Sequence, residues 1–227
     1  MSKDIRTTGI VLRRTDYGEA DRILNILTAE GKISALAKGV RKSKSKLAGA
    51  IELFSYSELN FHLSAKKDAL AILTGSRLIE HYANIAKDIN AMRLAGNIMK
   101  DADRHSEQIK SGDFLDLLRQ ALKTLDQLAS EKTDFEIIHI WWLLNLWRIS
   151  GEELNLHTDN AGQALSESEK YIWSPSDRSL QASEHGQITS DHIKFLRLLS
   201  STSLNTALRV NNYQKLLPQI SNLVKTN

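Results

Sequence analysis

Hydrophobic and polar residues alternate in short stretches over the first third of the chain, which predicts β-strands. The clearest alternation runs from Leu53 to Leu63. Strands are expected at about residues 6–14, 22–28, 33–37, 53–63 and 69–74, with a turn at Lys66-Lys67-Asp68 before the last. A longer excursion, residues 38–51, follows the third strand. Five short strands with one such excursion are typical of an OB-fold, a barrel that binds oligonucleotides and oligosaccharides.

From His81 onward, hydrophobic residues recur every three or four positions, which is the period of α-helices. A first helix is expected to run to about His105, with one apolar side formed by Ile85, Ile89, Met92 and Met99. A second begins at Asp113. A third follows the capping-box pair Thr133 and Glu136 and ends at Ser150-Gly151. The third is apolar nearly all round, so it should be central.

The remaining residues predict an irregular insertion and further helices. Periodicity is lost over about 151–190, where a short hairpin is expected at 171–180. Helical spacing returns from Asp191, and a last segment, 213–224, contains Pro218 as an expected kink. The change from strand to helix period predicts two domains, an OB-fold domain over residues 1–80 and a helical domain over 81–227. The fold class is therefore α+β.

The charge of the chain is uneven. Net charge is only +3, yet residues 1–80 carry 14 Lys and Arg against 9 Asp and Glu, whereas residues 81–227 carry 16 against 18. There is no cysteine, which excludes disulfides and thiolate metal sites. The N-terminus lacks the apolar core of a signal peptide, and the longest apolar run is about half a membrane span. We expect a cytoplasmic, nucleoid-associated protein.

The basic residues concentrate in Lys38–Lys46, five cations within nine residues. Because no acidic residue lies between Gly31 and Ile51, these cations and Lys32 should lack counter-charges, and phosphate is their natural partner. A solvated loop kept polar for solubility is the alternative, which the barrel setting makes less favoured. The predicted DNA-binding residues are Arg13, Arg14, Tyr17, Arg22, Lys32, Lys38, Arg41, Lys42, Lys44 and Lys46.

Three of these predictions have open alternatives. Tyr17 lies in a turn and is the best candidate for stacking on bases, whereas Phe61 is expected in the core. Arg13 and Arg22 could instead pair with Asp16, Glu19 or Asp21 and hold that turn. The same three carboxylates could serve a metal-dependent nuclease, but the arginines around them make ion pairing simpler. We find no phosphate loop or nucleophile motif and predict neither an enzyme nor a cofactor.

A long, ordered series of N-terminal residues carries a resemblance to a known family. The series is Gly9-Ile-Val-Leu-Arg-Arg-Thr-Asp-Tyr-Gly-Glu-Ala-Asp-Arg22, Leu27-Thr28, Gly31-Lys32, Ala37-Lys-Gly-Val-Arg41, Lys44-Ser-Lys46 and Leu53-Phe54. It resembles the N-terminal signature of the RecO family of bacterial DNA repair proteins. It implies an OB-fold followed by a helical domain. It also implies a recombination mediator that binds single- and double-stranded DNA, anneals complementary strands and assists recombinase loading, with RecR, the single-strand-binding protein and RecA as partners.

One family feature is missing, because many RecO proteins carry a four-cysteine zinc site in the irregular segment. The residues His157, Asp159, His185 and Asp191 remain nearby, without the paired spacing of a structural zinc site. We expect Tyr171, Ile172 and Trp173 to fold this segment by packing against the helices instead.

A protein-interaction scaffold is the alternative function. Its support is Trp141, Trp142 and Trp147, which are many large rings for one small helical domain. Packing in the core is the simpler interpretation of these rings. The resemblance allows both, since it implies a hydrophobic pocket on the helical domain for the C-terminal tail of the single-strand-binding protein.

Overall fold

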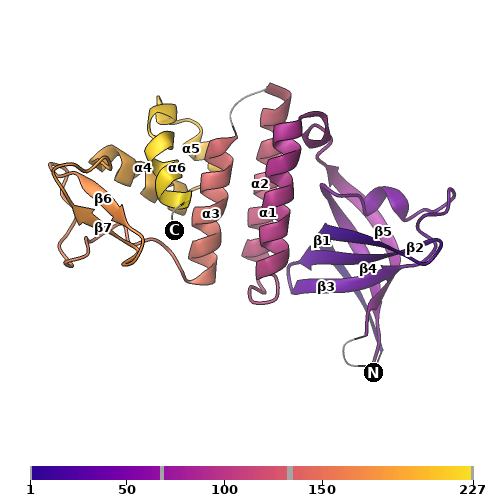
Figure 1. The fold of residues 1–227 in the computed structure, drawn as a ribbon. Coiled ribbons are helices and arrows are strands. Elements are labelled where there is room, and N and C mark those ends of the chain that lie inside the picture. Colours follow the sequence, from indigo (N-terminus) through magenta and orange to yellow (C-terminus); the bar gives the residue numbers. More distant parts are fainter. Residues whose placement is uncertain (1, 67–68, 132–134, 226–227) are drawn as a thin grey trace. The chain divides into compact units, whose positions relative to one another are not determined.

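The N-terminal part of the chain forms a five-stranded barrel (Figure 1). The computed structural model describes residues 2–66, 69–131 and 135–225. The strands are β1 (Lys3–Tyr17), β2 (Asp21–Thr28), β3 (Gly31–Ala37), β4 (Ser55–Leu63) and β5 (Ala71–His81). They pair in the order β1-β2-β3-β5-β4, and β4 pairs back onto β1 to close the ring. Among the barrel strands as the structure describes them, β3 and β5 are the one parallel pair, which agrees with the predicted OB-fold.

The barrel is filled by the side chains that point inward from its strands. Residues of the excursion after β3 complete this core, because Val40 and Ile51 are buried within it. Phe61, predicted as core, is fully buried there. The other buried members of the cluster are Val11, Leu24, Ile26, Ala35, Ala37, Leu59, Ala71 and Leu73. The excursion is therefore part of the barrel.

Two helices cover the outside of β1 and β2. They are α1 (Ile89–His105) and α2 (Gly112–Glu131), which pack on each other and on these strands. Ile10 and Leu27 are fully buried although they lie outside the barrel core cluster, since successive residues of a strand point to opposite faces. A β-bulge between Val11 and Arg13 sharpens the bend of β1 at this point.

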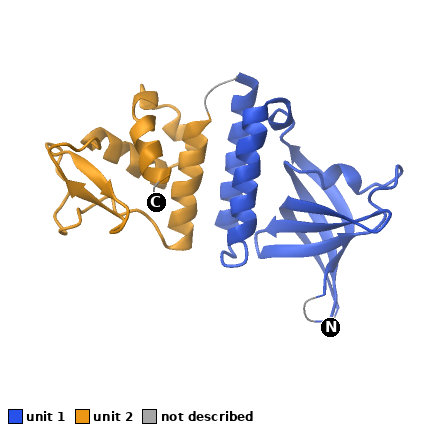
Figure 2. Cartoon of the chain, in the orientation of Figure 1, with its two compact units in different colours: residues 1–133 blue, residues 134–227 orange. Residues whose placement is uncertain are grey.

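The chain divides into two compact units, residues 1–133 (unit 1) and residues 134–227 (unit 2) (Figure 2). The predicted domain boundary at residue 80 coincides with the end of β5 at His81. The compact division lies later, because α1 and α2 pack on the barrel and stay with it. The change from strands to helices is therefore not the change from one compact unit to the next.

A polar cluster joins α2 to the barrel. Arg119 of α2 donates hydrogen bonds from Nε and Nη2 to the two carboxylate oxygens of Glu80, at 3.0 and 2.9 Å. The Tyr82 hydroxyl donates to the same carboxylate at 2.8 Å. The guanidinium also lies 4.4 Å from the ring centre of Tyr56 in β4. These bonds hold the pKa of Glu80 at about 2, chiefly through Arg119.

Unit 2 is built around α3 (Glu136–Ser150), which packs against α4 (Ser190–Ser201) and α6 (Leu217–Lys225). The predicted central position of α3 is confirmed, because most of its apolar side chains are buried, and Gly151 ends the helix in the left-handed conformation with φ 80°. The predicted hairpin is β6 (Tyr171–Ser174) with β7 (Ser179–Ala182). A short helix α5 (Leu204–Ala207) and a 3-10 turn η3 (Tyr213–Lys215) connect α4 to α6. Within the described ranges, no helix is both long and apolar enough to span a membrane.

The prediction of the first helix is wrong in two respects, the residue at which the helix begins and the burial of two of its apolar side chains. The 3-10 turn η2 (Ile85–Lys87) intervenes, and α1 begins only after Asp88, whose carboxylate accepts the N–H groups of Asn90 and Ala91. Ile85 and Met99 are buried as predicted, but Ile89 is 75% exposed and Met92 is 39% exposed. The spacing fails because Ile85 belongs to a separate element, so one helical period does not connect it to α1.

Pro218 does not kink the last helix. It lies in the first turn of α6, where the missing N–H costs no intrahelical hydrogen bond. The predicted turn Lys66-Lys67-Asp68 falls outside the described residues at Lys67 and Asp68, and Thr133, with its predicted capping role, also falls outside them.

Candidate nucleic-acid interface

The basic loop, residues 38–46, is fixed to the turn between β1 and β2. Val40, in its middle, is 2% exposed and anchors it in the barrel core. The Arg41 N–H donates to the carbonyl oxygen of Ala20 at 2.9 Å, and the Gly39 N–H donates to Asp21 Oδ1 at 2.7 Å. Gly39 has φ 63°, a left-handed conformation that favours glycine. The cations are thus carried on an anchored loop.

Three arginines of the predicted site pair with carboxylates around this turn. Arg22 Nε lies 2.9 Å from Asp16 Oδ1, and its Nη1 lies 3.6 Å from Glu52 Oε1. Arg14 also donates to Glu52, and Arg41 Nε lies 3.5 Å from Asp16 Oδ2. The hydrogen bond from Arg22 holds the pKa of Asp16 below its ordinary value. The ion-pairing alternative is confirmed for Arg22.

The predicted absence of counter-charges is wrong for Lys32 and Arg41. Lys32 Nζ lies 2.8 Å from Oδ1 of Asp103 in α1 and 3.2 Å from Oε1 of Glu107, just after the end of α1. Burial opposes its charged form, but the two carboxylates outweigh this and raise the pKa of Lys32. The prediction fails because the sequence run contains no acid, whereas the fold brings acids from distant segments. Lys32 therefore helps to hold α1 against the barrel.

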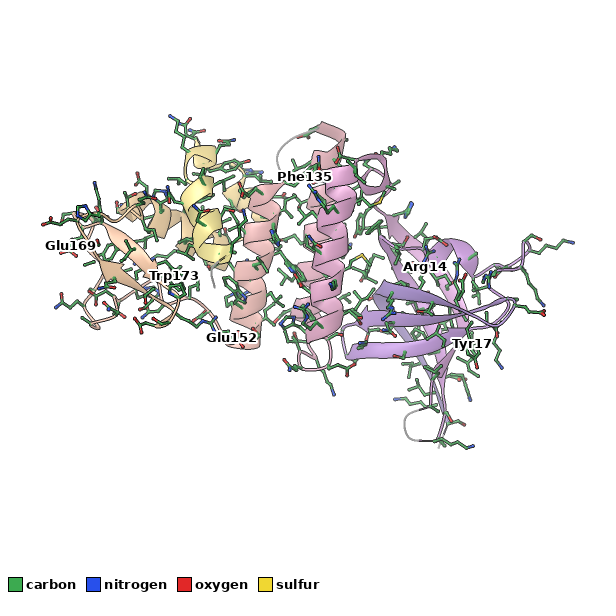
Figure 3. The ribbon with its side chains drawn as sticks, viewed as in Figure 1. Arg14, Tyr17, Phe135, Glu152, Glu169 and Trp173 are labelled. Atoms are coloured by element: carbon green, nitrogen blue, oxygen red, sulfur yellow. The ribbon has the colours of Figure 1, made fainter. Side chains whose placement is uncertain are left out.

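The other cations of the predicted site remain exposed. They have no ion pair within 4.0 Å to any residue that the structure describes, and they are Arg13, Lys38, Lys42, Lys44 and Lys46. Tyr17, at the end of β1, is 55% exposed (Figure 3). Four lysines on one anchored loop can bind phosphates without first breaking an internal ion pair.

Two residues of this region were missed from the sequence. Glu52 balances Arg14 and Arg22, and its signal was that it is the first acid after the basic run. Asp21 was considered only as an ion-pair or metal ligand, but its carboxylate accepts the loop amide of Gly39. Asp16 and Asp21 are both engaged in hydrogen bonds of this turn, and the described residues hold no cluster of three or more His, Asp or Glu side chains suited to a metal ion.

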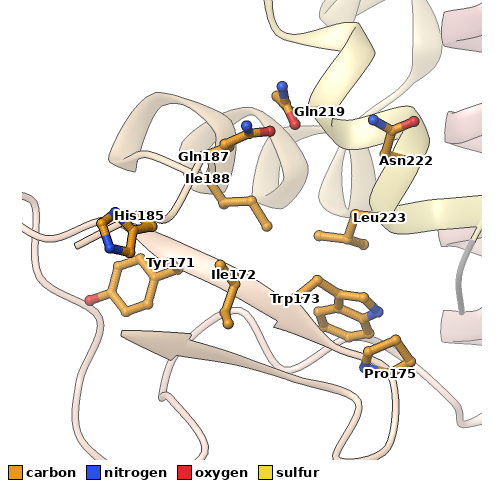
Figure 4. Close-up of a pocket in the computed structure, with 10 residues that line it drawn as sticks. All are labelled: Tyr171, Ile172, Trp173, Pro175, His185, Gln187, Ile188, Gln219, Asn222 and Leu223. Atoms are coloured by element: carbon orange, nitrogen blue, oxygen red, sulfur yellow. The ribbon is translucent and has the colours of Figure 1, made fainter. Parts of the chain in front are cut away.

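The irregular segment of unit 2 folds around Tyr171. This side chain is 1% exposed, and its hydroxyl accepts the Ser166 N–H at 2.7 Å. Its backbone pairs with that of Ile188. Trp173 lines a pocket of about 450 Å³ with Leu223 of α6 (Figure 4). Tyr171 is therefore buried, as packing in this segment requires, but the predicted packing of Ile172 is wrong: it is 41% exposed because successive residues of a strand point to opposite faces.

Two of the three tryptophans in α3 belong to the core. Trp142 is fully buried, and Trp141 is 3% exposed with its Nε1–H donating to the Thr202 carbonyl oxygen at 3.1 Å. Trp147 is partly exposed. The core interpretation of Trp141 and Trp142 is confirmed, so they offer no docking surface.

A different surface of unit 2 is hollowed between α4 and η3. The groove has a volume of about 550 Å³ and an apolar floor formed by Phe195, Leu198, Val210 and Leu216. Lys194, Lys215 and Asp191 also line it. Phe195 is held in place by stacking on Tyr213, with ring centres 6.0 Å apart.

Comparison with known proteins shows which family this chain is similar to. The domain family described as "Recombination protein O N terminal" matches residues 1–82. The DNA repair protein RecO of Dehalococcoides mccartyi is 30% identical over 234 residues, covering 99% of this chain and 89% of that one. The RecO of Desulfatibacillum aliphaticivorans is 32% identical, covering 65% of this chain and 57% of its own. The RecO of Bacillus pumilus is 35% identical, covering 59% of this chain and 50% of its own.

The match with the Dehalococcoides mccartyi protein extends through both units, and the domain match coincides with the barrel. The N-terminal strand order and the helical region after it are those that the resemblance implies. The chain therefore belongs to the RecO family of DNA repair and recombination proteins.

Proposed function

We propose that this protein is a recombination mediator that binds single- and double-stranded DNA through the basic loop and promotes annealing of complementary strands. The observation that carries the proposal is the set of four exposed lysines, Lys38, Lys42, Lys44 and Lys46, on a loop anchored by Val40. Arg13 on β1 and Arg41 within the loop add further cations, and Tyr17 offers a ring on which a base can stack.

Annealing requires two strands to approach each other while their bases stay free to pair. Lysines that neutralise phosphates lower the repulsion between the strands and leave the base edges uncovered. Arg14, Arg22 and Lys32 have a different role in this mechanism, because their charges are already balanced by Glu52, Asp16 and Asp103. They shape the surface on which the exposed lysines act. The proposed reaction makes and breaks no covalent bond.

The salt dependence of DNA binding tests this proposal. Four phosphate contacts should give a plot of log affinity against log salt with a slope of about −3 for a single-stranded oligonucleotide and about −3.6 for a duplex. Fluorescence anisotropy of labelled oligonucleotides at several salt concentrations measures both slopes. Binding that does not weaken with salt, or no binding at low salt, would contradict the proposal.

We also propose that the groove between α4 and η3 docks the acidic C-terminal tail of the single-strand-binding protein. An apolar floor suits a hydrophobic side chain of the tail, and Lys194 and Lys215 suit its carboxylates. Lys215 is the better contact, since Lys194 already pairs with Glu167 at 2.7 Å. Asp191 also lines the groove and limits the attraction.

Lys215→Glu should weaken binding of the tail peptide by roughly tenfold, the effect of one charged contact replaced by repulsion. Lys170→Glu is the matched control, because Lys170 is exposed in the same unit and does not line this groove. A titration of the labelled peptide into each full-length variant measures the difference. Equal affinity in both variants would place the tail elsewhere.

Recombinase loading, with RecR and RecA as partners, is proposed on the strength of family membership. The same membership supports action at the nucleoid. Recombinase loading is tested by whether the chain accelerates displacement of the single-strand-binding protein by RecA in the presence of RecR.

A further inference from the structure

Besides the hydrogen bond from Arg41 Nη1 to the Gly18 carbonyl oxygen at 3.3 Å, two hydrogen bonds from backbone amides attach the basic loop to the β1–β2 turn. One joins main chain to main chain, from the Arg41 N–H to the Ala20 carbonyl oxygen. The other joins main chain to side chain, from the Gly39 N–H to Asp21 Oδ1 at 2.7 Å. The second is the attachment that a substitution can remove without changing the loop itself.

The position of Asp21 explains why it captures this amide. Strands β2 and β3 pair along their length, and the last pair at this end joins Arg22 to Ala37. Asp21 is the first residue past the last pair on β2, and Gly39 is the second on the other side. The carboxylate therefore continues the strand pairing by one more hydrogen bond, at the point where the basic loop begins.

We propose that Asp21 is a positioning residue for DNA binding, which presents Lys38 and Lys42 by holding Gly39. This inference rests on the proposed function of the basic loop. An acid in a phosphate-binding surface should weaken binding by repulsion if charge alone matters. As an acceptor it should strengthen binding, because a loop ordered in advance loses less conformational entropy when DNA binds.

Two substitutions separate charge from hydrogen bonding. Asp21→Asn removes the negative charge and keeps an oxygen acceptor, whereas Asp21→Ala removes both. We expect Asp21→Ala to bind a single-stranded oligonucleotide about tenfold more weakly, and Asp21→Asn to bind at least as tightly as the wild type. Asp116→Ala is the charge-matched control, because Asp116 is an exposed carboxylate of α2.

Hydrogen exchange of the loop amides in the absence of DNA gives a second, independent result. Exchange at Gly39 and Arg41 should accelerate in Asp21→Ala and stay near wild type in Asp21→Asn. Tighter or unchanged DNA binding by Asp21→Ala, or equal loss in both variants, would overturn the proposal, as would unchanged exchange. Accelerated exchange in a protein whose wild type shows no salt-dependent DNA binding would instead refute the proposed function and leave the attachment intact.

Discussion

Replacing Lys42, Lys44 and Lys46 with glutamate should lower the affinity for single-stranded DNA by about 100-fold at low salt. The change removes three of four exposed lysines and introduces three repulsive charges. It should also reduce the salt slope from about −3 to about −1, because each phosphate contact contributes about 0.7. Acceleration of annealing between two labelled complementary oligonucleotides should be lost in parallel.

The choice of these three lysines follows from their lack of an internal role. They have no ion pair to a described residue, so their replacement leaves the ion pairs of the turn unchanged. Arg41 is excluded, because its pair with Asp16 and its N–H bond to Ala20 would make loss of binding ambiguous.

A control with the same net charge separates a local site from general attraction. Lys100→Glu/Lys110→Glu/Lys170→Glu changes the charge of the protein equally at three exposed lysines outside the basic loop. We expect this variant to retain most of the affinity. An equal loss of affinity in both triple variants would show that DNA binding depends on net charge alone. Retained affinity in both variants would place the DNA path away from this loop.

The sequence predicts the barrel better than the surroundings of its site. Alternation over Leu53–Leu63 and the short turns between the first strands are local signals, and the structure has all five predicted strands. The long amphipathic stripe of α2 is local in the same way. Each depends on residues that lie within a few positions of one another, so no knowledge of the tertiary structure is needed.

The ion pairs could not be predicted by the same means. Lys32 meets Asp103 and Glu107, which lie some seventy positions along the chain and reach it only because α1 packs on the barrel. A search for nearby acids in the sequence cannot find such partners. The prediction that Ile89 lies on the buried side of the helix was also wrong. Asp88 caps α1, so the helix and its hydrophobic period begin only after that residue. The predictable part of the site is its charge, and the unpredictable part is which charges are already balanced.

The attachment of α2 to the barrel leads to the largest expected effect on stability. Arg119→Met should destabilise unit 1 by about 2 kcal/mol, because it leaves the partly buried Glu80 without its main hydrogen-bond donor. The full shift in the pKa of Glu80 would correspond to a larger loss of unfolding free energy. However, one quarter of that side chain is exposed, and solvent weakens the ion pair. Glu80→Gln should have a similar effect, and the double variant should lose less than the two single changes combined.

The pair of Glu80 and Arg119 also makes the unfolding free energy depend on pH, and the lowered pKa of Glu80 gives the sign of that dependence. The pKa of Glu80 is lowered from 4.5 to about 2, so its contribution is complete above pH 4.5 and is lost as pH falls from about 4.5 towards 2. The unfolding free energy of Glu80→Gln should therefore fall less steeply than that of the wild type over this range. A fall of equal steepness in both proteins would mean that the Arg119 pair contributes nothing in solution.

The measurement must report on unit 1 alone. All four tryptophans, at 141, 142, 147 and 173, lie in unit 2, so intrinsic tryptophan fluorescence follows the unfolding of that unit. Hydrogen exchange of peptides from β5 and α2 in increasing urea follows unit 1. Arg119→Met should shift the exchange transition and leave the tryptophan transition in place. Lys194→Met breaks an equally short but exposed pair with Glu167 in unit 2, and it should shift the tryptophan transition far less than Arg119→Met shifts the exchange transition, since exposed pairs contribute little.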